Sequence, residues 1–198
     1  VTSFAEVALA SAAADALHPA FSNLFVQTQI IAPRGAILCT RRPRSHDEHP
    51  PWMFHLMAVH GADSLDVSYE TDRMAFIGRG RTAASPLAMT TAGRLSGGHG
   101  SVLDPVVAIR HRLTLLPQQT VTIDIASGMA DTRDAALALV GKYQDRHLAE
   151  RVFDLAWTHS WVTLRQINAT EADAQLYARL ASSVIYANAS LRAENSVV

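Results

Sequence analysis

The sequence predicts a mainly β protein, in which an antiparallel β-sandwich is followed by α-helices. Two observations support this fold class. Up to residue 130 the apolar residues form short runs or alternate with polar residues, and Gly, Pro and polar turns separate the segments. From Asp131 onward they recur with helical spacing. Because about seven strands follow one another without intervening helices, an antiparallel sandwich is favoured over a parallel sheet.

The predicted strands cover residues 3–10, 24–31, 36–40, 52–60, 65–77, 106–116 and 120–126. In residues 120–126 apolar and polar side chains alternate, which is typical of a half-buried strand. Residues 113–116 lie across the short turn Pro117-Gln-Gln119, so we expect them to pair with that strand in a hairpin. Residues 52–59 are apolar on both faces, which predicts a central strand covered on each side.

Three helices are predicted in the C-terminal part. Asp131 or Thr132 can cap the first, which runs to Tyr143. The second covers residues 146–167, and the sequence Thr170-Glu-Ala-Asp173 approximates a capping box that opens the third. We therefore expect a sandwich domain over residues 1–130 and a helical linker segment over residues 131–198.

Composition limits the class of protein. The chain has 198 residues, 48% of them apolar and 18% charged, which is ordinary for a soluble fold. Its net charge of −1 gives no reason to expect nucleic acid or an anionic membrane as a partner. The single cysteine, Cys39, excludes an intramolecular disulfide. Because the chain starts at Val1 without a methionine, we expect it to be an internal fragment of a longer protein.

Residues 69–81, with the sequence Tyr-Glu-Thr-Asp-Arg-Met-Ala-Phe-Ile-Gly-Arg-Gly-Arg, are the first candidate for a functional site. Two glycines alternate there with two arginines. Glycine permits backbone conformations and close approaches that a side chain forbids, and arginine carries a planar fork of donors that suits carboxylates, phosphates and hydroxyl-rich ligands. The candidate residues are Arg79 and Arg81 as ligand contacts, with Gly78 and Gly80 shaping the backbone.

Further charges precede this loop and allow two interpretations. Glu70, Asp72 and Arg73 can form a salt-bridge lattice with the arginines of the loop, or the whole stretch can present a polar face to a sugar or phosphate. Local chemistry favours the lattice, because most such charges are structural. In the second interpretation Asp72 and Arg73 hold the strand end that aims the loop. Trp52 is a further candidate for stacking on a sugar ring, although its apolar surroundings favour core packing.

Other sequence features do not predict a catalytic or metal site. His46, His49, His55 and His60 fit no standard zinc spacing, and the last two lie on opposite faces of their strand. The glycine-rich sequence Gly97-Gly-His-Gly100 lies in a candidate flexible loop and leads into no helix, so it is not a phosphate loop. We therefore predict no catalytic residue and no metal ligand in this chain.

The sequence Tyr69–Arg73, followed by Phe76 and by Gly78–Arg81, resembles the sandwich domain of cyclic β-1,2-glucan synthases, which contain a phosphorylase-type module (glycoside hydrolase family 94, glycosyltransferase family 36 type). A shorter part of it is also similar to cellobiose and chitobiose phosphorylases. Five other segments agree with the resemblance: His18-Pro-Ala-Phe21 with Leu24-Phe25, Thr40-Arg-Arg-Pro-Arg-Ser45, Leu103-Asp-Pro105, Ala156-Trp-Thr158 and Tyr186-Ala-Asn188.

The resemblance implies a supersandwich-like domain whose first strands precede Val1, then linker helices that lead to an (α/α)6 catalytic barrel missing from this chain. It implies transfer or phosphorolysis at β-linked glucose chains, with inorganic phosphate as co-substrate and without a metal or organic cofactor. The catalytic acid of the family belongs to the barrel, so we expect no turnover by this chain alone. The parent would be an inner-membrane protein with this module on the cytoplasmic side, while the fragment itself is soluble and makes no direct membrane contact.

Two roles for the chain remain open. One is a structural module that shapes or covers the active site of the barrel, with Arg79 and Arg81 projecting toward the barrel of the same protomer or a neighbour. The other is an independent β-glucan-binding module that uses these arginines and Trp52. The first is favoured because the sequence identifies no exposed aromatic platform. The parent could also be a cellobiose- or chitobiose-phosphorylase-like enzyme. The expected partners are β-glucan or an oligosaccharide, the catalytic barrel, and a second copy of the chain paired through open sheet edges.

Overall fold

The computed structural model describes residues 1–43, 45–62 and 64–185. Two residues or segments quoted for the resemblance, Arg44 and residues 186–188, lie outside this part of the chain. The chain divides into two compact units, Val1–Ala149 and Glu150–Val198. The prediction of a mainly antiparallel β fold with helices is confirmed, since every strand pair of the described residues is antiparallel.

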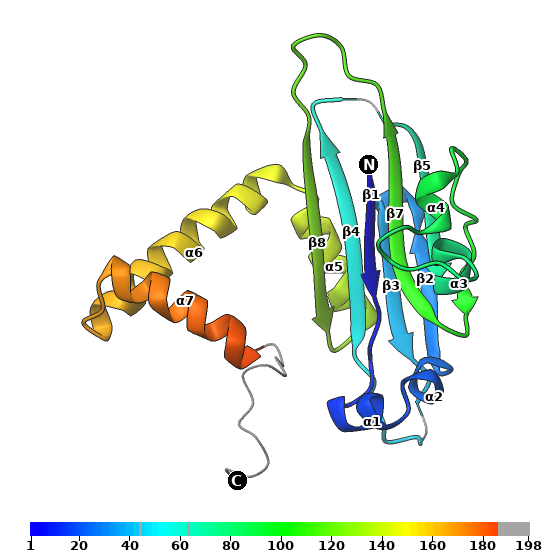
Figure 1. Ribbon diagram of the computed structural model, residues 1–198, viewed down its shortest axis with the longest axis horizontal. Helices are drawn as coiled ribbons and strands as arrows, with labels where there is room; N and C mark the ends of the chain where they lie inside the picture. The colour runs from blue at the N-terminus through cyan, green and yellow to red at the C-terminus, as the bar shows by residue number, and fades with distance from the viewer. Residues whose placement is uncertain (44, 63, 186–198) are drawn as a thin grey trace. The chain divides into compact units, whose positions relative to one another are not determined.

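The strands form two sheets, which face each other as a sandwich (Figure 1). The three-stranded sheet has the order β1-β7-β5 and consists of β1 (Thr2–Glu6), β7 (Pro105–Leu113) and β5 (Ser64–Asp72). The five-stranded sheet has the order β6-β2-β3-β4-β8 and consists of β6 (Gly100–Ser101), β2 (Val26–Ile31), β3 (Ala36–Arg41), β4 (Trp52–His60) and β8 (Thr122–Ala130).

The core between the sheets is built from every second residue of the facing strands. Ile37 of β3, Met57 of β4 and Ile109 of β7 are buried in one apolar cluster. Polar contacts also cross between the sheets. Oγ1 of Thr28 lies 2.8 Å from Oγ1 of Thr71, and both threonines are buried.

Helices cover both outer faces. Helix α5 (Arg133–Tyr143) packs Ala136 and Val140 against the five-stranded sheet. It begins as predicted, because Oγ1 of Thr132 accepts a hydrogen bond from the backbone N–H of Ala135. On the outer face of the three-stranded sheet, α3 (Arg73–Ile77) and α4 (Leu87–Thr90) form a separate apolar cluster with β7.

Strand β4 confirms the prediction of a central strand covered on both sides. Phe54 and Leu56 point to α5, whereas Met57 points to the core between the sheets. The predicted hairpin is wrong, because β7 pairs with β1 and β5 while β8 pairs with β4. The segment between β7 and β8 thus connects one sheet to the other. β7 and β8 therefore hydrogen-bond to different strands and not to each other.

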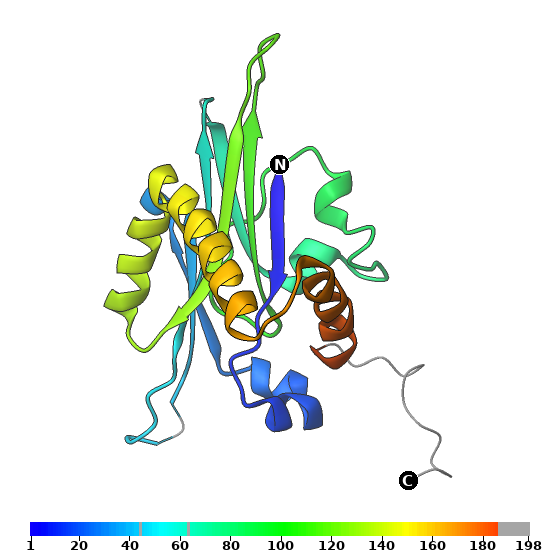
Figure 2. The same ribbon diagram turned by 90° about the vertical axis from the view of Figure 1, so that its left-hand side faces the viewer.

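The long strand predicted over residues 65–77 is also wrong beyond Asp72. The carboxylate of Asp72 accepts hydrogen bonds from the backbone N–H groups of Met74 (2.7 Å) and Ala75 (3.4 Å), and these bonds start α3. Two more short helices, α1 (Ala12–Leu17) and α2 (Pro19–Asn23), connect β1 to β2 at one end of the sandwich (Figures 1 and 2). A single 3₁₀ turn, Ala32–Arg34, joins β2 to β3.

The C-terminal helices are α6 (Arg146–Gln166), which begins in the first unit, and α7 (Glu171–Ile185). The predicted capping box is confirmed, since Thr170 N donates to Asp173 Oδ2 (2.8 Å) and Asp173 N donates to Thr170 Oγ1 (3.3 Å). Among the described helices, none combines the length and hydropathy that a membrane crossing requires.

Candidate functional site

Arg73 is the hub of a polar network at the α1–α2 end of the sandwich. Its guanidinium forms ion pairs with Glu6 at the end of β1 and with Asp104, which precedes β7. Its backbone N–H also donates to the carbonyl of Asp104 (2.9 Å). Asn23 of α2 donates from Nδ2 to Oδ1 of Asp104 (3.2 Å). Four segments that are far apart in the sequence are therefore tied together at one place.

These side chains line an open hollow of about 840 Å³. Its walls also carry apolar side chains that are unusually exposed, because Phe21 is 54% and Leu103 is 75% accessible. The lining residues are Glu6, Val7, Ala8, Asp15, His18, Pro19, Ala20, Phe21, Asn23, Leu24, Arg73, Leu103, Asp104 and Pro105. An apolar surface left open in a concavity is typical of a binding site.

The hollow brings together three segments that carry the family resemblance. These are residues 18–25, 72–73 and 103–105, and their polar and apolar side chains make up most of its wall. Of the residues proposed from the sequence, Arg73 lies in this wall and Asp72 fixes the helix that carries it. Glu6 and Asn23 were missed, since neither stands out in its own segment. Their role depends on contacts with Arg73 and Asp104.

The glycine–arginine loop lies beyond the C-terminal end of α3. Gly78 has φ +85°, and its N–H donates to the carbonyl of Met74 (2.9 Å). A Cβ at this position would lie 2.8 Å from Cβ of Leu87, so only glycine fits. Arg81 donates from Nη1 to Oγ1 of Thr90 (3.1 Å), which ties the loop to α4. Arg79 is exposed, and its side chain has no hydrogen bond or ion pair within the described residues.

Replacing Gly78 by alanine should lower the free energy of unfolding by about 2 kcal/mol, because the new Cβ meets Leu87 and the positive φ is strained. Gly80→Ala is the matched control. Gly80 also has a positive φ (+72°), but its Cβ would have no heavy atom within 4 Å, so we expect a loss of about 1 kcal/mol. Urea denaturation of both variants measures the difference. Equal losses would mean that contact with Leu87 does not matter.

The salt-bridge lattice that local chemistry favoured is wrong in its partners. Glu70 is buried, and it accepts hydrogen bonds from backbone N–H groups instead of pairing with the loop arginines. Asp72 caps α3, and Arg73 pairs with acids more than 25 residues away in the sequence. Local proximity of opposite charges did not identify these pairings.

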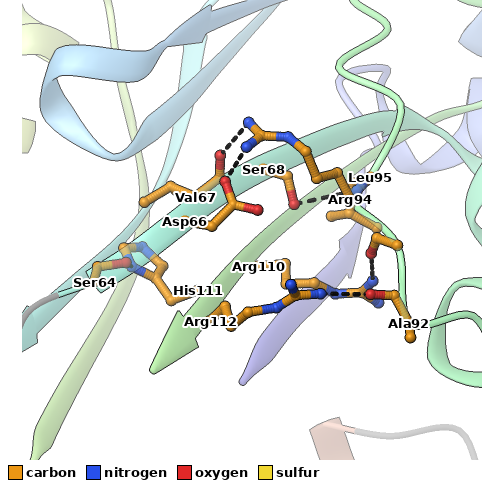
Figure 3. Close-up of polar contacts among 11 residues, drawn as sticks. Ser64, Asp66, Val67, Ser68, Ala92, Arg94, Leu95, Arg110, His111 and Arg112 are labelled. Atoms are coloured by element: carbon orange, nitrogen blue, oxygen red, sulfur yellow. Dashed lines mark hydrogen bonds and ion pairs between the residues drawn. The ribbon is translucent and has the colours of Figure 1, made fainter. Parts of the chain in front are cut away.

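Polar side chains of β5 hold the loop of residues 92–98, which covers the outer face of the three-stranded sheet. Asp66 binds the guanidinium of Arg94, and Oγ of Ser68 accepts from the backbone N–H of Leu95 (3.2 Å; Figure 3). Arg112 of β7 holds the same loop by donating to the carbonyl of Ala92 (2.5 Å). The glycine-rich loop that we expected to be flexible is therefore fixed to the sheet along residues 92–98.

Trp52 is not brought to the loop of Arg79 and Arg81. It lies on the outer face of the five-stranded sheet, half-buried beside the residues that pack against α5. This position agrees with core packing. His55 and His60 lie on opposite faces of β4, as predicted: His55 contacts Ser3 of the facing sheet, and His60 pairs with Asp124. Within the described residues, no three His, Cys, Asp or Glu side chains gather as metal ligands would.

Comparison with known proteins agrees with the resemblance in the sequence. Residues 1–146 match the family model described as the glycosyl hydrolase 94 supersandwich domain. The chain is also 30% identical over 198 residues to the cyclic beta-(1,2)-glucan synthase NdvB of Rhizobium meliloti (strain 1021). That alignment covers 100% of this chain and 7% of the relative, so the chain spans a small part of the protein that it matches. The chain belongs to the glycosyl hydrolase 94 supersandwich domain family.

Proposed function

We propose that this chain is the non-catalytic supersandwich of a β-glucan phosphorylase or transferase, and that it shapes or covers the active site of a catalytic barrel in a longer protein. The name of the relative, a cyclic beta-(1,2)-glucan synthase, supports β-1,2-glucan as the substrate class. In this proposal the helices after residue 130 link the sandwich to the barrel. Inorganic phosphate is the co-substrate, and no metal or organic cofactor takes part.

The loop of Gly78 to Arg81 carries this proposal. Its base is held by the hydrogen bond from Gly78 N–H to the carbonyl of Met74 and by the hydrogen bond from Arg81 to Thr90. Arg79 extends from this fixed base into solvent without a partner among the described residues. A guanidinium on a positioned loop suits a phosphate, a carboxylate or sugar hydroxyls outside the chain. The alternative is that Arg79 is a solvated surface residue without a role.

The test uses the longer protein with Arg79 and Arg81 replaced by alanine. We expect release of glucose 1-phosphate from linear β-1,2-glucan to fall about 100-fold, because small misplacements at a reacting centre have effects of that size. The melting temperature should barely change, since exposed polar contacts contribute only about 0–1 kcal/mol. Arg133→Ala is the control, as Arg133 is an exposed arginine bound to Gln29 on another face.

Full activity in the double variant would contradict the proposal. So would release of glucose 1-phosphate by the 198-residue chain alone, because the proposal places no catalytic group in it.

A further inference from the structure

We infer that the hollow lined by Phe21, Asn23, Arg73 and Asp104 is a saccharide-binding site, which holds one or two glucose units of a β-linked glucan. The inference adds a second contact to the proposed function and rests on it for the identity of the sugar. The pocket itself determines the chemical class of the ligand, through its size, its charge and its exposed apolar wall.

The hollow has the size of a ligand site and is formed before a ligand arrives. Its volume of about 840 Å³ lies within the range of about 300–1,000 Å³ typical of small-molecule pockets. The ion pairs of Arg73 with Glu6 and Asp104 set the polar side chains in place. The hydrogen bond from Asn23 to Asp104 holds Asn23 beside them. Because these groups are already ordered, binding costs less side-chain entropy.

The charge of the lining disfavours an anionic ligand. Three carboxylates, those of Glu6, Asp15 and Asp104, line the hollow together with a single guanidinium, that of Arg73. A phosphate or a carboxylated ligand would be repelled by this excess of negative charge. Carboxylate oxygens accept hydrogen bonds from hydroxyl groups, so a neutral ligand rich in hydroxyls fits the same lining.

The polar side chains retain capacity for such bonds. Arg73 uses Nη1 and Nε for its ion pairs, and within the described part of the chain its Nη2 has no partner. The same holds for Oε2 of Glu6 and Oδ1 of Asn23. The side chains of Arg73, Glu6 and Asp104 are 36%, 60% and 49% accessible, so a ligand can reach them. Planar groups of this kind bind two neighbouring hydroxyls at once.

Phe21 supplies the apolar part of the site. Its ring is 54% accessible and packs edge-on against Phe25, with centroids 5.2 Å apart and an interplanar angle of 75°. This contact holds the ring in place while leaving much of it exposed beside the polar groups. One face of a pyranose carries mainly C–H groups and is apolar, so it can stack on such a ring while its hydroxyls reach the carboxylates.

Isothermal titration calorimetry of the 198-residue chain with linear β-1,2-glucan tests the site. We expect saturable binding that Phe21→Ala and Asp104→Asn each weaken about tenfold or more. Phe153→Ala is the matched control, because Phe153 is an exposed phenylalanine (74%) outside the hollow, and it should leave the affinity unchanged. Circular dichroism spectra and melting curves establish that each variant is folded. Inorganic phosphate and an α-1,4-linked glucose oligomer serve as ligand controls.

Three results would overturn the inference: no heat of binding with the glucan, binding that neither Phe21→Ala nor Asp104→Asn weakens, or saturable binding of phosphate that these two substitutions weaken. Binding of the α-linked oligomer as tightly as the β-linked glucan would overturn the assignment to a β-linked sugar. This test measures the binding affinity of the 198-residue chain. The test of the proposed function measures the activity of the longer protein with Arg79 and Arg81 replaced, so the two hypotheses can fail independently. Neither arginine lines the hollow.

Discussion

Replacement of Glu70 by alanine is expected to lower the free energy of unfolding by about 4 kcal/mol. The side chain is 2% exposed. Its Oε1 accepts from the backbone N–H groups of Thr71 (3.0 Å) and Asp72 (3.1 Å), and its Oε2 accepts from that of Ser96 (3.2 Å). Removing the carboxylate leaves these three backbone donors without their acceptor, and each buried donor left unsatisfied costs about 1–3 kcal/mol.

Two further variants serve as comparisons for Glu70→Ala. Glu70→Gln keeps the shape and one acceptor oxygen, but its amide nitrogen cannot accept from Ser96, so we expect a loss of about 1–2 kcal/mol. Glu6→Ala removes an exposed carboxylate and should cost about 0–1 kcal/mol. Urea denaturation gives the three values, and hydrogen exchange at Ser96 reports detachment of the loop. If Glu70→Ala costs no more than Glu6→Ala, the buried carboxylate does not anchor the loop.

Lowering the pH from 7 to 4 is expected to reduce the stability of the sandwich by about 3 kcal/mol through His55. The imidazole lies between Oγ of Ser127 (2.7 Å) and Oγ of Ser3 (2.9 Å), and it is 3% exposed. Burial lowers the pKa of His55 from 6.5 to about 4. The folded state therefore holds the neutral ring at a pH where the unfolded chain binds a proton.

Because the unfolded chain binds a proton more readily than the folded state, the free energy of unfolding falls as the pH falls. The stability contribution is complete above pH 6.5 and is lost as the pH falls from 6.5 to about 4, which corresponds to about 3 kcal/mol. Burial also lowers the pKa of His111, which adds a loss in the same direction. Chemical denaturation at a series of pH values, in the unsubstituted chain and in the His55→Gln variant, isolates the contribution of His55. His99→Gln, at an exposed histidine, is the control. If the free energy of unfolding depends on pH in the same way in the unsubstituted chain and in His55→Gln, the prediction is wrong.

The sequence predicted those elements whose evidence is local. An apolar run on both faces identified β4, and a capping threonine identified the start of α5. The pairing of β8 was not predictable in this way, because an alternating pattern reports that one face is buried and does not report against what. The short turn favoured β7 as its neighbour, whereas tertiary packing placed β8 beside β4.

The candidate site shows the same division. Asp72 and Arg73 were proposed from their own sequence, and the structure places Arg73 in the wall of the hollow. Their partners could not be found locally, because Glu6 and Asp104 meet Arg73 only after β1, β5 and β7 have paired. Glu70 was expected to join a salt-bridge lattice with the arginines of the loop. Its face is covered by the backbone of a loop and not by water.

Two of the polar contacts between the sheets have a mechanical consequence. Apolar packing resists separation of two layers but is non-directional, so by itself it permits them to slide. The contact of Thr28 with Thr71 links the sheets at β5, and the contact of Ser3 with His55 links them at β1. Because β5 and β1 are the two edge strands of the three-stranded sheet, both of its edges are held against sliding past the other sheet. The hollow takes α2 from the chain entering one sheet and Arg73 from the end of the other. Sliding of one sheet past the other would move these two parts of the wall relative to each other, so both contacts oppose a change in the spacing of a site that neither of them touches.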